Sequence, residues 1–215
     1  DSMPFLHYHN PDATFTTRGC IRSCPFCAVP KIEGQFHELQ DFEAKPIVCD
    51  NNLLACSHAH FNKVIDKLKP LKGIDFNQGL DCRLLDTYHV ERFKELDLSV
   101  IRFAWDFVEE EFALFRAIEK VLSAGFKAKK IRVYVLIGFN DTPNDALYRC
   151  KKLITYGILP NVMRYQPLNS LTKNSYVSEN WTAQLLADFS RYWNRLNWLG
   201  HIPWEVYKSK QLELK

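Results

Sequence analysis

The sequence predicts an α/β fold in which six strand–helix units form an open, partial barrel, with a C-terminal helix covering the opening. Two observations lead to this fold class. Short β-rich runs alternate with longer amphipathic stretches, a pattern typical of a mostly parallel sheet with helical crossovers. At about 30 residues per unit, the chain has room for five or six units, whereas a closed TIM barrel has eight and takes about 250 residues. We therefore expect a TIM-like partial (β/α)6 barrel.

The individual elements follow from local patterns along the chain. Strands are expected at residues 13–17, 46–50, 73–77, 99–104, 132–138 and 161–165. Helices are expected where apolar residues recur at helical spacing, at 60–71, 87–97, 110–125, 144–157 and, as a terminal helix, 181–200. The chain then divides into an N-terminal extension (1–12), the partial barrel (13–168) and a C-terminal helical segment that packs on the barrel (169–215).

Composition narrows the class of protein. With 47% hydrophobic and 25% charged residues, the sequence is typical of a soluble globular protein. Its apolar runs are too short to span a bilayer, and its beginning lacks the layout of a signal peptide, so we expect no membrane partner. A net charge of +3 neither requires nor excludes nucleic acid. Seven cysteines without a secretory signal favour a reducing compartment, with the cytoplasm as the expected location.

Three of these cysteines, Cys20, Cys24 and Cys27, lie close together after the first expected strand. Thiolates are the usual ligands of iron–sulfur clusters, and three of them can each hold one iron of a [4Fe–4S] cubane. The fourth iron would then be free to bind a cofactor or substrate. A structural zinc site completed by a distant histidine, or unrelated free thiols, are the alternatives.

The spacing Cys20-x-x-x-Cys24-x-x-Cys27, with Phe26 before the last cysteine, resembles the signature of the radical S-adenosylmethionine (radical SAM) enzymes. The resemblance covers residues 13–168, and TRGCIRSCPFCAVPKIEG is similar to the loops of methylthiotransferases and of the cobalamin-dependent branch. It implies a [4Fe–4S] cluster on the three cysteines and S-adenosylmethionine on the free iron. It also implies a reductant such as flavodoxin or ferredoxin, and cleavage to a 5′-deoxyadenosyl radical that abstracts hydrogen from a substrate the sequence does not specify.

Other stretches refine this resemblance. The runs LLACSHAHF, DFNQGLDCRLL, RFAWDF and VYVLIGF resemble a set of radical SAM proteins related to the cobalamin-dependent branch. In that set a degenerate cobalamin-type domain precedes the barrel, whereas only about a dozen residues precede the first expected strand here. We therefore expect no cobalamin.

The resemblance also implies that Phe26, beside the cluster, and residues at the ends of the strands contact S-adenosylmethionine. Asp50, Asn51 and Asn52 follow the second strand, where the family holds the amino group of the cofactor; an ordinary Asx turn is the alternative. Gln78 and Arg83 follow the third strand, and the planar guanidinium of Arg83 could pair with the cofactor carboxylate. A salt bridge from Arg83 to Asp81 or Asp86 is the alternative there.

Two further strand ends complete the expected cofactor site. Asp106 follows the fourth strand and could accept hydrogen bonds from the ribose, or cap a helix instead. Gly138 and Asn140 follow the fifth strand, in a region that resembles the adenine-flanking segment of the family. The family segment carries a glutamate, and this sequence has Asn140 and Asp141 in its place. The resemblance therefore implies no contact from an acidic side chain here.

The remaining cysteines bear on competing functions. Cys49, Cys56, Cys82 and Cys150 form no second C-x-x-C, and we expect them to be small core residues. Methylthio transfer to RNA, which would need a second cluster, is one alternative function. A non-catalytic iron–sulfur or zinc module is the other.

Overall fold

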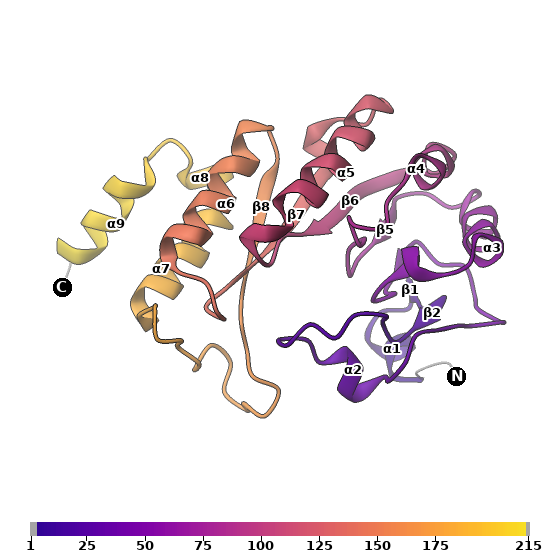
Figure 1. The fold of residues 1–215 in the computed structure, drawn as a ribbon, viewed down its shortest axis with the longest axis horizontal. Coiled ribbons are helices and arrows are strands. Elements are labelled where there is room, and N and C mark those ends of the chain that lie inside the picture. Colours follow the sequence, from indigo (N-terminus) through magenta and orange to yellow (C-terminus); the bar gives the residue numbers. More distant parts are fainter. Residues whose placement is uncertain (1–3, 214–215) are drawn as a thin grey trace. The chain divides into compact units, whose positions relative to one another are not determined.

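The computed structural model describes residues 4–213, whose strands form a six-stranded sheet in the order β1-β4-β5-β6-β7-β8 (Figure 1). A separate two-stranded ribbon pairs β2 with β3. The chain separates into two compact units. Unit 1 runs up to Ala104 and includes Glu111–Arg132, and unit 2 consists of Trp105–Glu110 and the chain from Val133 onward.

Unit 1 contains four parallel strands. They are β1 (Ala13–Thr14), β4 (Ile47–Val48), β5 (Ile74–Phe76) and β6 (Leu98–Ala104). The register pairs Ala13 with Ile47, and Ile47 with Asp75, so the carboxyl ends of these strands share one edge of the sheet. In α/β proteins this edge is where functional side chains gather.

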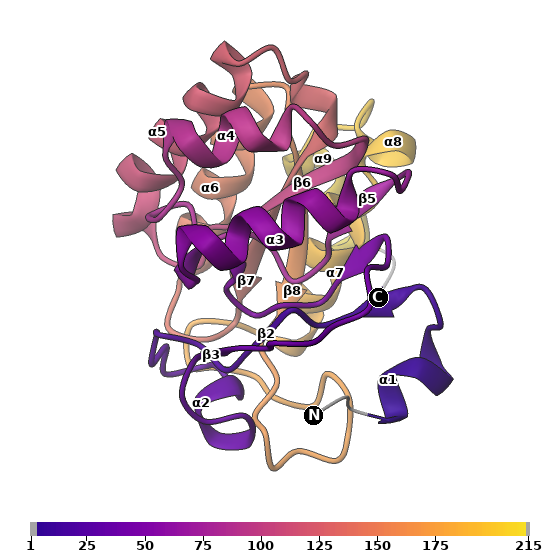
Figure 2. The same cartoon turned by 90° about the vertical axis from the view of Figure 1, so that its right-hand side faces the viewer.

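Three amphipathic helices accompany these strands: α3 (His58–Leu68), α4 (Thr87–Phe93) and α5 (Glu111–Ser123). Figure 2 shows α3 and α4 side by side, and both bury aromatic side chains in the core. Ser57 and Asp86 cap the first turns of α3 and α4 by accepting backbone N–H bonds. Shorter helical segments are α1 (Pro4–His9), α2 (Val29–Ile32), η1 (Leu53–Ala55) and η3 (Ala128–Lys130).

The connection from β1 to β4 departs from the regular strand–helix pattern. It contains the antiparallel ribbon of β2 (Thr17–Arg18) and β3 (His37–Glu38), in which Thr17 pairs with Glu38. The segment between these two short strands carries α2 and all three clustered cysteines. The ribbon therefore brings the two ends of the cysteine segment together.

Unit 2 contains two strands, β7 (Ile131–Ile137), which belongs to it from Val133 onward, and β8 (Leu159–Arg164). Its helices are η2 (Val108–Glu110), α6 (Pro143–Thr155), α7 (Ala183–Trp193), α8 (Leu196–Leu199) and α9 (Trp204–Glu213). Both α6 and α7 pack against β8. Just after α7, the side-chain amide of Asn194 donates to the carbonyl of Val162 (2.8 Å) and accepts from its N–H (2.7 Å). Phe189, Tyr192 and Trp204 form an aromatic cluster that joins α7 to α9.

The structure confirms the predicted α/β fold with a mostly parallel six-stranded sheet, while barrel curvature and a covering role for the C-terminal helix stay predictions. The expected terminal helix at 181–200 is divided, because α7 ends at Trp193 and α8 begins at Leu196. Among the described residues, no helix combines the length and apolar character needed to cross a membrane.

Candidate functional site

The three clustered cysteines are free thiols, and each is half-buried. The N–H of Cys27 donates to the carbonyl of Cys24 (3.0 Å), which makes a tight turn between the last two. Phe26 lies inside this turn and is half-buried as well. The cysteine loop, residues 19–33, therefore combines partial solvent access with a local backbone turn between Cys24 and Cys27.

Glu33 closes the cysteine loop with three contacts. Its carboxylate accepts hydrogen bonds from the backbone N–H of Gly19 (3.0 Å) and from Nδ2 of Asn51 (2.7 Å), and it pairs with Arg18 (3.1 Å). The Arg18 guanidinium in turn lies over the ring of Phe15, 3.9 Å from its centre. Glu33 thus joins the beginning of the loop to Asn51, in the segment that follows β4.

The sulfur of Cys20 accepts two hydrogen bonds. The backbone N–H of Arg22 lies 3.3 Å from it, and Nδ2 of Asn52 lies 3.7 Å from it. Such N–H···S contacts stabilise negative charge on a thiolate sulfur and help set the potential of a cluster bound to it. Asn52, one of the predicted cofactor contacts, is therefore placed directly against a cysteine of the loop.

Asp81 organises the donors around Cys20. Its Oδ2 accepts from Nε of Arg22 (2.9 Å) and from Nδ2 of Asn52 (3.2 Å), and its Oδ1 accepts from Nε of Arg83 (2.7 Å). Burial alone would raise the pKa of Asp81, but Arg83 and Arg22 bring that pKa below its usual value. The salt bridge from Arg83 to Asp81, which was the alternative role of Arg83, is thus present. Gln78, the other predicted contact after β5, is exposed.

Asp50 occupies a different environment from its two neighbours. It is only 3% exposed, and its carboxylate accepts from the N–H and hydroxyl of Thr16 and from the N–H of Thr17 (3.0 Å). Burial raises its pKa against the effect of these hydrogen bonds. These hydrogen bonds join the segment after β4 to the residues after β1. The contact of Asp50 with a cofactor stays a prediction.

The other predicted contacts belong to unit 2. The N–H of Asp106 donates to Glu110 (3.1 Å), and the N–H of Gly138 donates to Oδ1 of Asp141 (2.8 Å). Gly138 has φ +74°, and a Cβ there would lie 2.8 Å from Leu186, so this turn requires glycine. Asn140 is exposed beside it.

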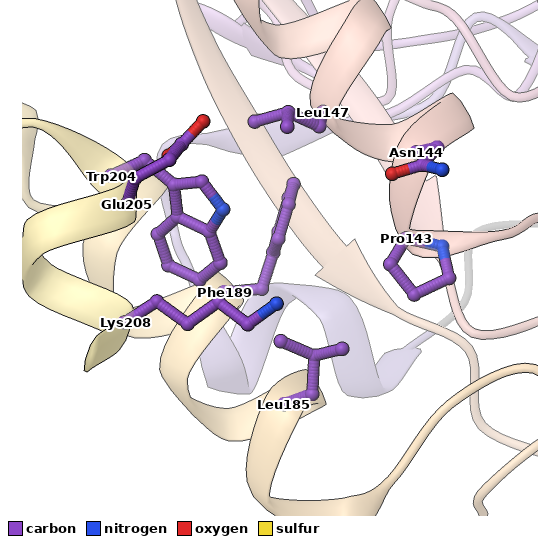
Figure 3. Close-up of a pocket in the computed structure, with 8 residues that line it drawn as sticks. All are labelled: Pro143, Asn144, Leu147, Leu185, Phe189, Trp204, Glu205 and Lys208. Atoms are coloured by element: carbon purple, nitrogen blue, oxygen red, sulfur yellow. The ribbon is translucent and has the colours of Figure 1, made fainter. Parts of the chain in front are cut away.

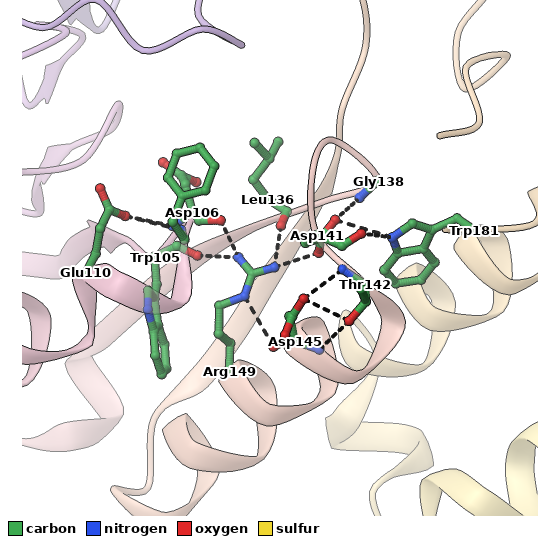
Figure 4. A network of polar contacts seen from close by, with 11 residues as sticks. Trp105, Asp106, Glu110, Leu136, Gly138, Asp141, Thr142, Asp145, Arg149 and Trp181 are labelled. Atoms are coloured by element: carbon green, nitrogen blue, oxygen red, sulfur yellow. Dashed lines mark hydrogen bonds and ion pairs between the residues drawn. The ribbon is translucent and has the colours of Figure 1, made fainter. Parts of the chain in front are cut away.

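Arg149 of α6, which was not among the residues expected at the site, holds both of these strand ends (Figure 4). Its side chain is fully buried; Nη1 donates to the carbonyls of Trp105 (2.7 Å) and Asp106 (2.8 Å). Nη2 donates to the carbonyl of Leu136 (2.9 Å) and to Asp141 (2.6 Å). Its one sequence signal is a charged residue at an apolar position of the helix, next to Cys150.

The residues of the cysteine loop fit a cluster by their chemistry. Within residues 4–213, no three or more His, Cys, Asp or Glu side chains are grouped so as to hold a metal ion, so the thiol sulfurs do not converge on one point. The fit rests instead on three accessible thiols and on Asn52, whose buried Oδ1 accepts no hydrogen bond from any residue that the structure describes. An unpaired buried acceptor is unfavourable unless a ligand supplies a donor.

The four remaining cysteines are buried, as expected of core residues. Burial raises the pKa of Cys56 to about 12, so this thiol is a poor metal ligand at neutral pH. The neighbouring His60 is hydrogen-bonded through Nε2 to the carbonyl of Thr16 (3.0 Å). These contacts leave Cys56 and His60 in structural roles.

Unit 2 also contains a pocket with a volume of about 210 Å³ between α6, α7 and α9 (Figure 3). Its walls are largely apolar, and Glu205 and Lys208 lie among its lining residues. The other lining residues are Pro143, Asn144, Leu147, Leu185, Phe189 and Trp204. None of the predicted site residues lines this pocket.

No known family model matches the chain, and no curated protein matches it either.

Proposed function

We propose that this chain is a radical SAM enzyme that holds a [4Fe–4S] cluster through Cys20, Cys24 and Cys27. The observation that carries the proposal is the cysteine loop itself. Three half-buried thiols at the spacing of the radical SAM signature lie in the connection between the parallel strands β1 and β4. Two N–H donors on Cys20 and the closure of the loop by Glu33 support it.

When bound and reduced, such a cluster supplies the electron that cleaves S-adenosylmethionine to a 5′-deoxyadenosyl radical. The chain's own residues would bind and orient the cofactor. Asn52 offers an unpaired acceptor oxygen for the amino group. Arg83, anchored at Nε by Asp81, is the proposed partner of the carboxylate. Asp106, Gly138 and Asn140 are the proposed contacts of the adenosine part, with Arg149 fixing the backbone of Asp106.

The test is anaerobic reconstitution of the full chain with iron and sulfide. We expect about four irons per chain, an EPR signal of the reduced protein that changes when S-adenosylmethionine is added, and formation of 5′-deoxyadenosine. Dithionite, or a flavodoxin or ferredoxin with its reductase, provides the electrons. A cluster that forms but does not respond to S-adenosylmethionine would overturn the proposal in favour of a redox or structural module.

Matched cysteine variants make this test specific. Cys24→Ala should lose the cluster and 5′-deoxyadenosine formation while keeping the circular dichroism spectrum of the wild type. Cys150→Ala removes a thiol that is buried in α6 and should keep both the cluster and the activity. Loss of folding in Cys24→Ala would instead favour a structural zinc or cluster site. About eight irons per chain would favour a second cluster and the methylthiotransferase alternative.

A further inference from the structure

We propose that the pocket between α6, α7 and α9 binds a small carboxylate whose other end is apolar, such as a phenyl or branched aliphatic group. The pocket has a volume of about 210 Å³, and all of its lining residues belong to unit 2. None of the residues proposed to hold the cluster or S-adenosylmethionine lines it. The inference therefore goes beyond the proposed function and does not depend on it.

The volume of the pocket limits the size of the ligand. An apolar cavity of about 150 Å³ is large enough to bind benzene, whereas sites for drug-sized ligands take about 300–1,000 Å³. A pocket of about 210 Å³ therefore matches a single ring, or a branched aliphatic group, with a short polar substituent. A nucleotide is too large for it.

The walls of the pocket determine the apolar part of the ligand. Phe189 of α7 and Trp204 of α9 contribute aromatic rings, which meet edge to face with their centres 5.2 Å apart. Leu147 and Leu185 add aliphatic groups from α6 and α7. A ligand that enters removes apolar surface from water, and a planar ring adds the favourable geometry of aromatic pairs.

These walls are held in place by contacts around the pocket. Tyr192 of α7 packs against Trp204, and its hydroxyl donates to the carbonyl of Ile202 (2.7 Å), so the beginning of α9 is fixed against α7. Lys151 of α6 pairs with Glu205 of α9 (3.0 Å) and joins these two helices. Because the protein itself holds the walls, a ligand has little conformational entropy to remove from them.

The charged side chains of the lining determine the polar part of the ligand. They are Glu205 and Lys208, and Glu205 already pairs with Lys151. Lys208 has no ion-pair partner among the residues that the structure describes, and Figure 3 shows its side chain extending from α9 toward the middle of the group of lining residues. One positive charge thus lies beside an apolar space, and a carboxylate complements it.

The test uses the full chain as purified and three probes: phenylacetate, its neutral amide phenylacetamide, and acetate. Binding is followed by NMR through the indole N–H of Trp204, whose signal is assigned by its absence in Trp204→Phe. Phenylacetate should shift this signal with a Kd of about 1–10 mM, as expected of a ligand with about ten non-hydrogen atoms. Phenylacetamide should bind about two- to fivefold more weakly, the range typical of an exposed ion pair. Acetate lacks apolar surface and should leave the signal unchanged at the same concentrations.

Matched variants test the charge of the pocket. Lys208→Gln should bind phenylacetate and phenylacetamide with the same Kd, because the new side chain carries no charge. Lys173→Gln makes the same change at an exposed lysine outside the lining and should keep the wild-type ratio of the two Kd values. Leu147→Phe places a larger side chain in the lining and should weaken both phenyl ligands together. The two lysine variants carry the test if Leu147→Phe fails to fold.

Three results would overturn the inference. An unchanged Trp204 signal with phenylacetate shows that the pocket takes no such ligand. Equal Kd values for phenylacetate and phenylacetamide in the wild type indicate a neutral apolar occupant instead, such as a side chain of a partner protein. A ratio that persists in Lys208→Gln assigns the preference to another cation. These measurements require no iron, so their failure leaves the proposed function standing.

Discussion

The carboxylate of Glu33 accepts a hydrogen bond from the backbone N–H of Gly19, 14 positions earlier in the chain, over 3.0 Å. All three clustered cysteines lie between these two residues. The protein's own polar contacts therefore hold the two ends of the loop together. A loop closed in this way loses less conformational entropy when it binds a cluster than an open one would.

Replacing Glu33 with glutamine should weaken this closure. The variant leaves the guanidinium of Arg18, a side chain that is 9% exposed, without its ion-pair partner. We expect the free energy of unfolding to fall by about 2–3 kcal/mol, together with a lower yield of bound iron after reconstitution. Urea unfolding and iron analysis measure the two effects. The Glu43 side chain is 77% exposed in its pair with Lys45, so Glu43→Gln should change neither. An unchanged iron yield in Glu33→Gln would contradict this role.

Gly19→Ala and Gly34→Ala should separate backbone strain from steric conflict. Both glycines have positive φ, +70° and +75°. A Cβ at Gly19 would lie 2.3 Å from the carbonyl oxygen of Gln35, whereas nothing lies within 4 Å of one at Gly34. Gly34→Ala should cost about 1–2 kcal/mol for the left-handed conformation alone. Gly19→Ala should cost clearly more in urea unfolding, and equal losses would show that the loop relaxes around Gly19.

Arg149→Met should be among the most destabilising substitutions in unit 2. It leaves the carboxylate of Asp141 and the strand-end carbonyls of Trp105 and Leu136 without their common donor. Breaking a buried ion pair by removing one partner typically costs about 3–5 kcal/mol. Thermal or urea unfolding measures the loss. Lys151→Met, two residues further along α6 in an exposed pair with Glu205, should cost less than about 1 kcal/mol.

Stability should decline when the pH falls below about 6.5, partly because of His89. Burial lowers the pKa of this side chain in the folded protein, against the raising effect of Asp86. The unfolded chain therefore binds a proton at a higher pH than the folded one. The contribution of His89 is complete above its unfolded pKa and is lost as the pH falls through its folded pKa.

Urea unfolding at about pH 7.5 and about pH 5.5 measures this loss. His89→Gln keeps a polar side chain at the third position of α4, where glutamine suits the capping box, but does not titrate. The variant should lose less stability than the wild type between the two pH values. Equal losses would assign the effect to other groups.

The strands were predicted well because their patterns are local. In β7, buried and half-buried residues alternate over Ile131–Ile137, and the expected strand at 132–138 differs by one residue at each end. Boundaries set by capping were less accurate. The helix expected at 60–71 begins at His58, because Ser57 caps it, and ends at Leu68, shortly before Pro70.

The parts of unit 1 that local patterns missed are those made by distant residues. The ribbon of β2 and β3 pairs Thr17 with Glu38 from beyond the cysteine segment, and no local pattern indicates such a pairing. The same reason applies to the candidate site. Spacing alone identifies the cysteines as a group, but the bonds from Arg22 and Asn52 to Asp81 join residues 59 and 29 positions apart. Such pairings depend on which strand ends lie side by side in the fold, and local sequence patterns do not indicate this.

The amide of Asn194 has a consequence for association between molecules. A strand at the end of a sheet exposes unpaired N–H and C=O groups that can recruit a strand from another chain. β8 is the last strand in the sheet order, and Asn194 occupies both polar backbone groups of Val162, much as a neighbouring peptide unit would. One side chain therefore takes the place of a strand at this point of the edge, and the backbone of Val162 is not available to pair with a strand of another chain.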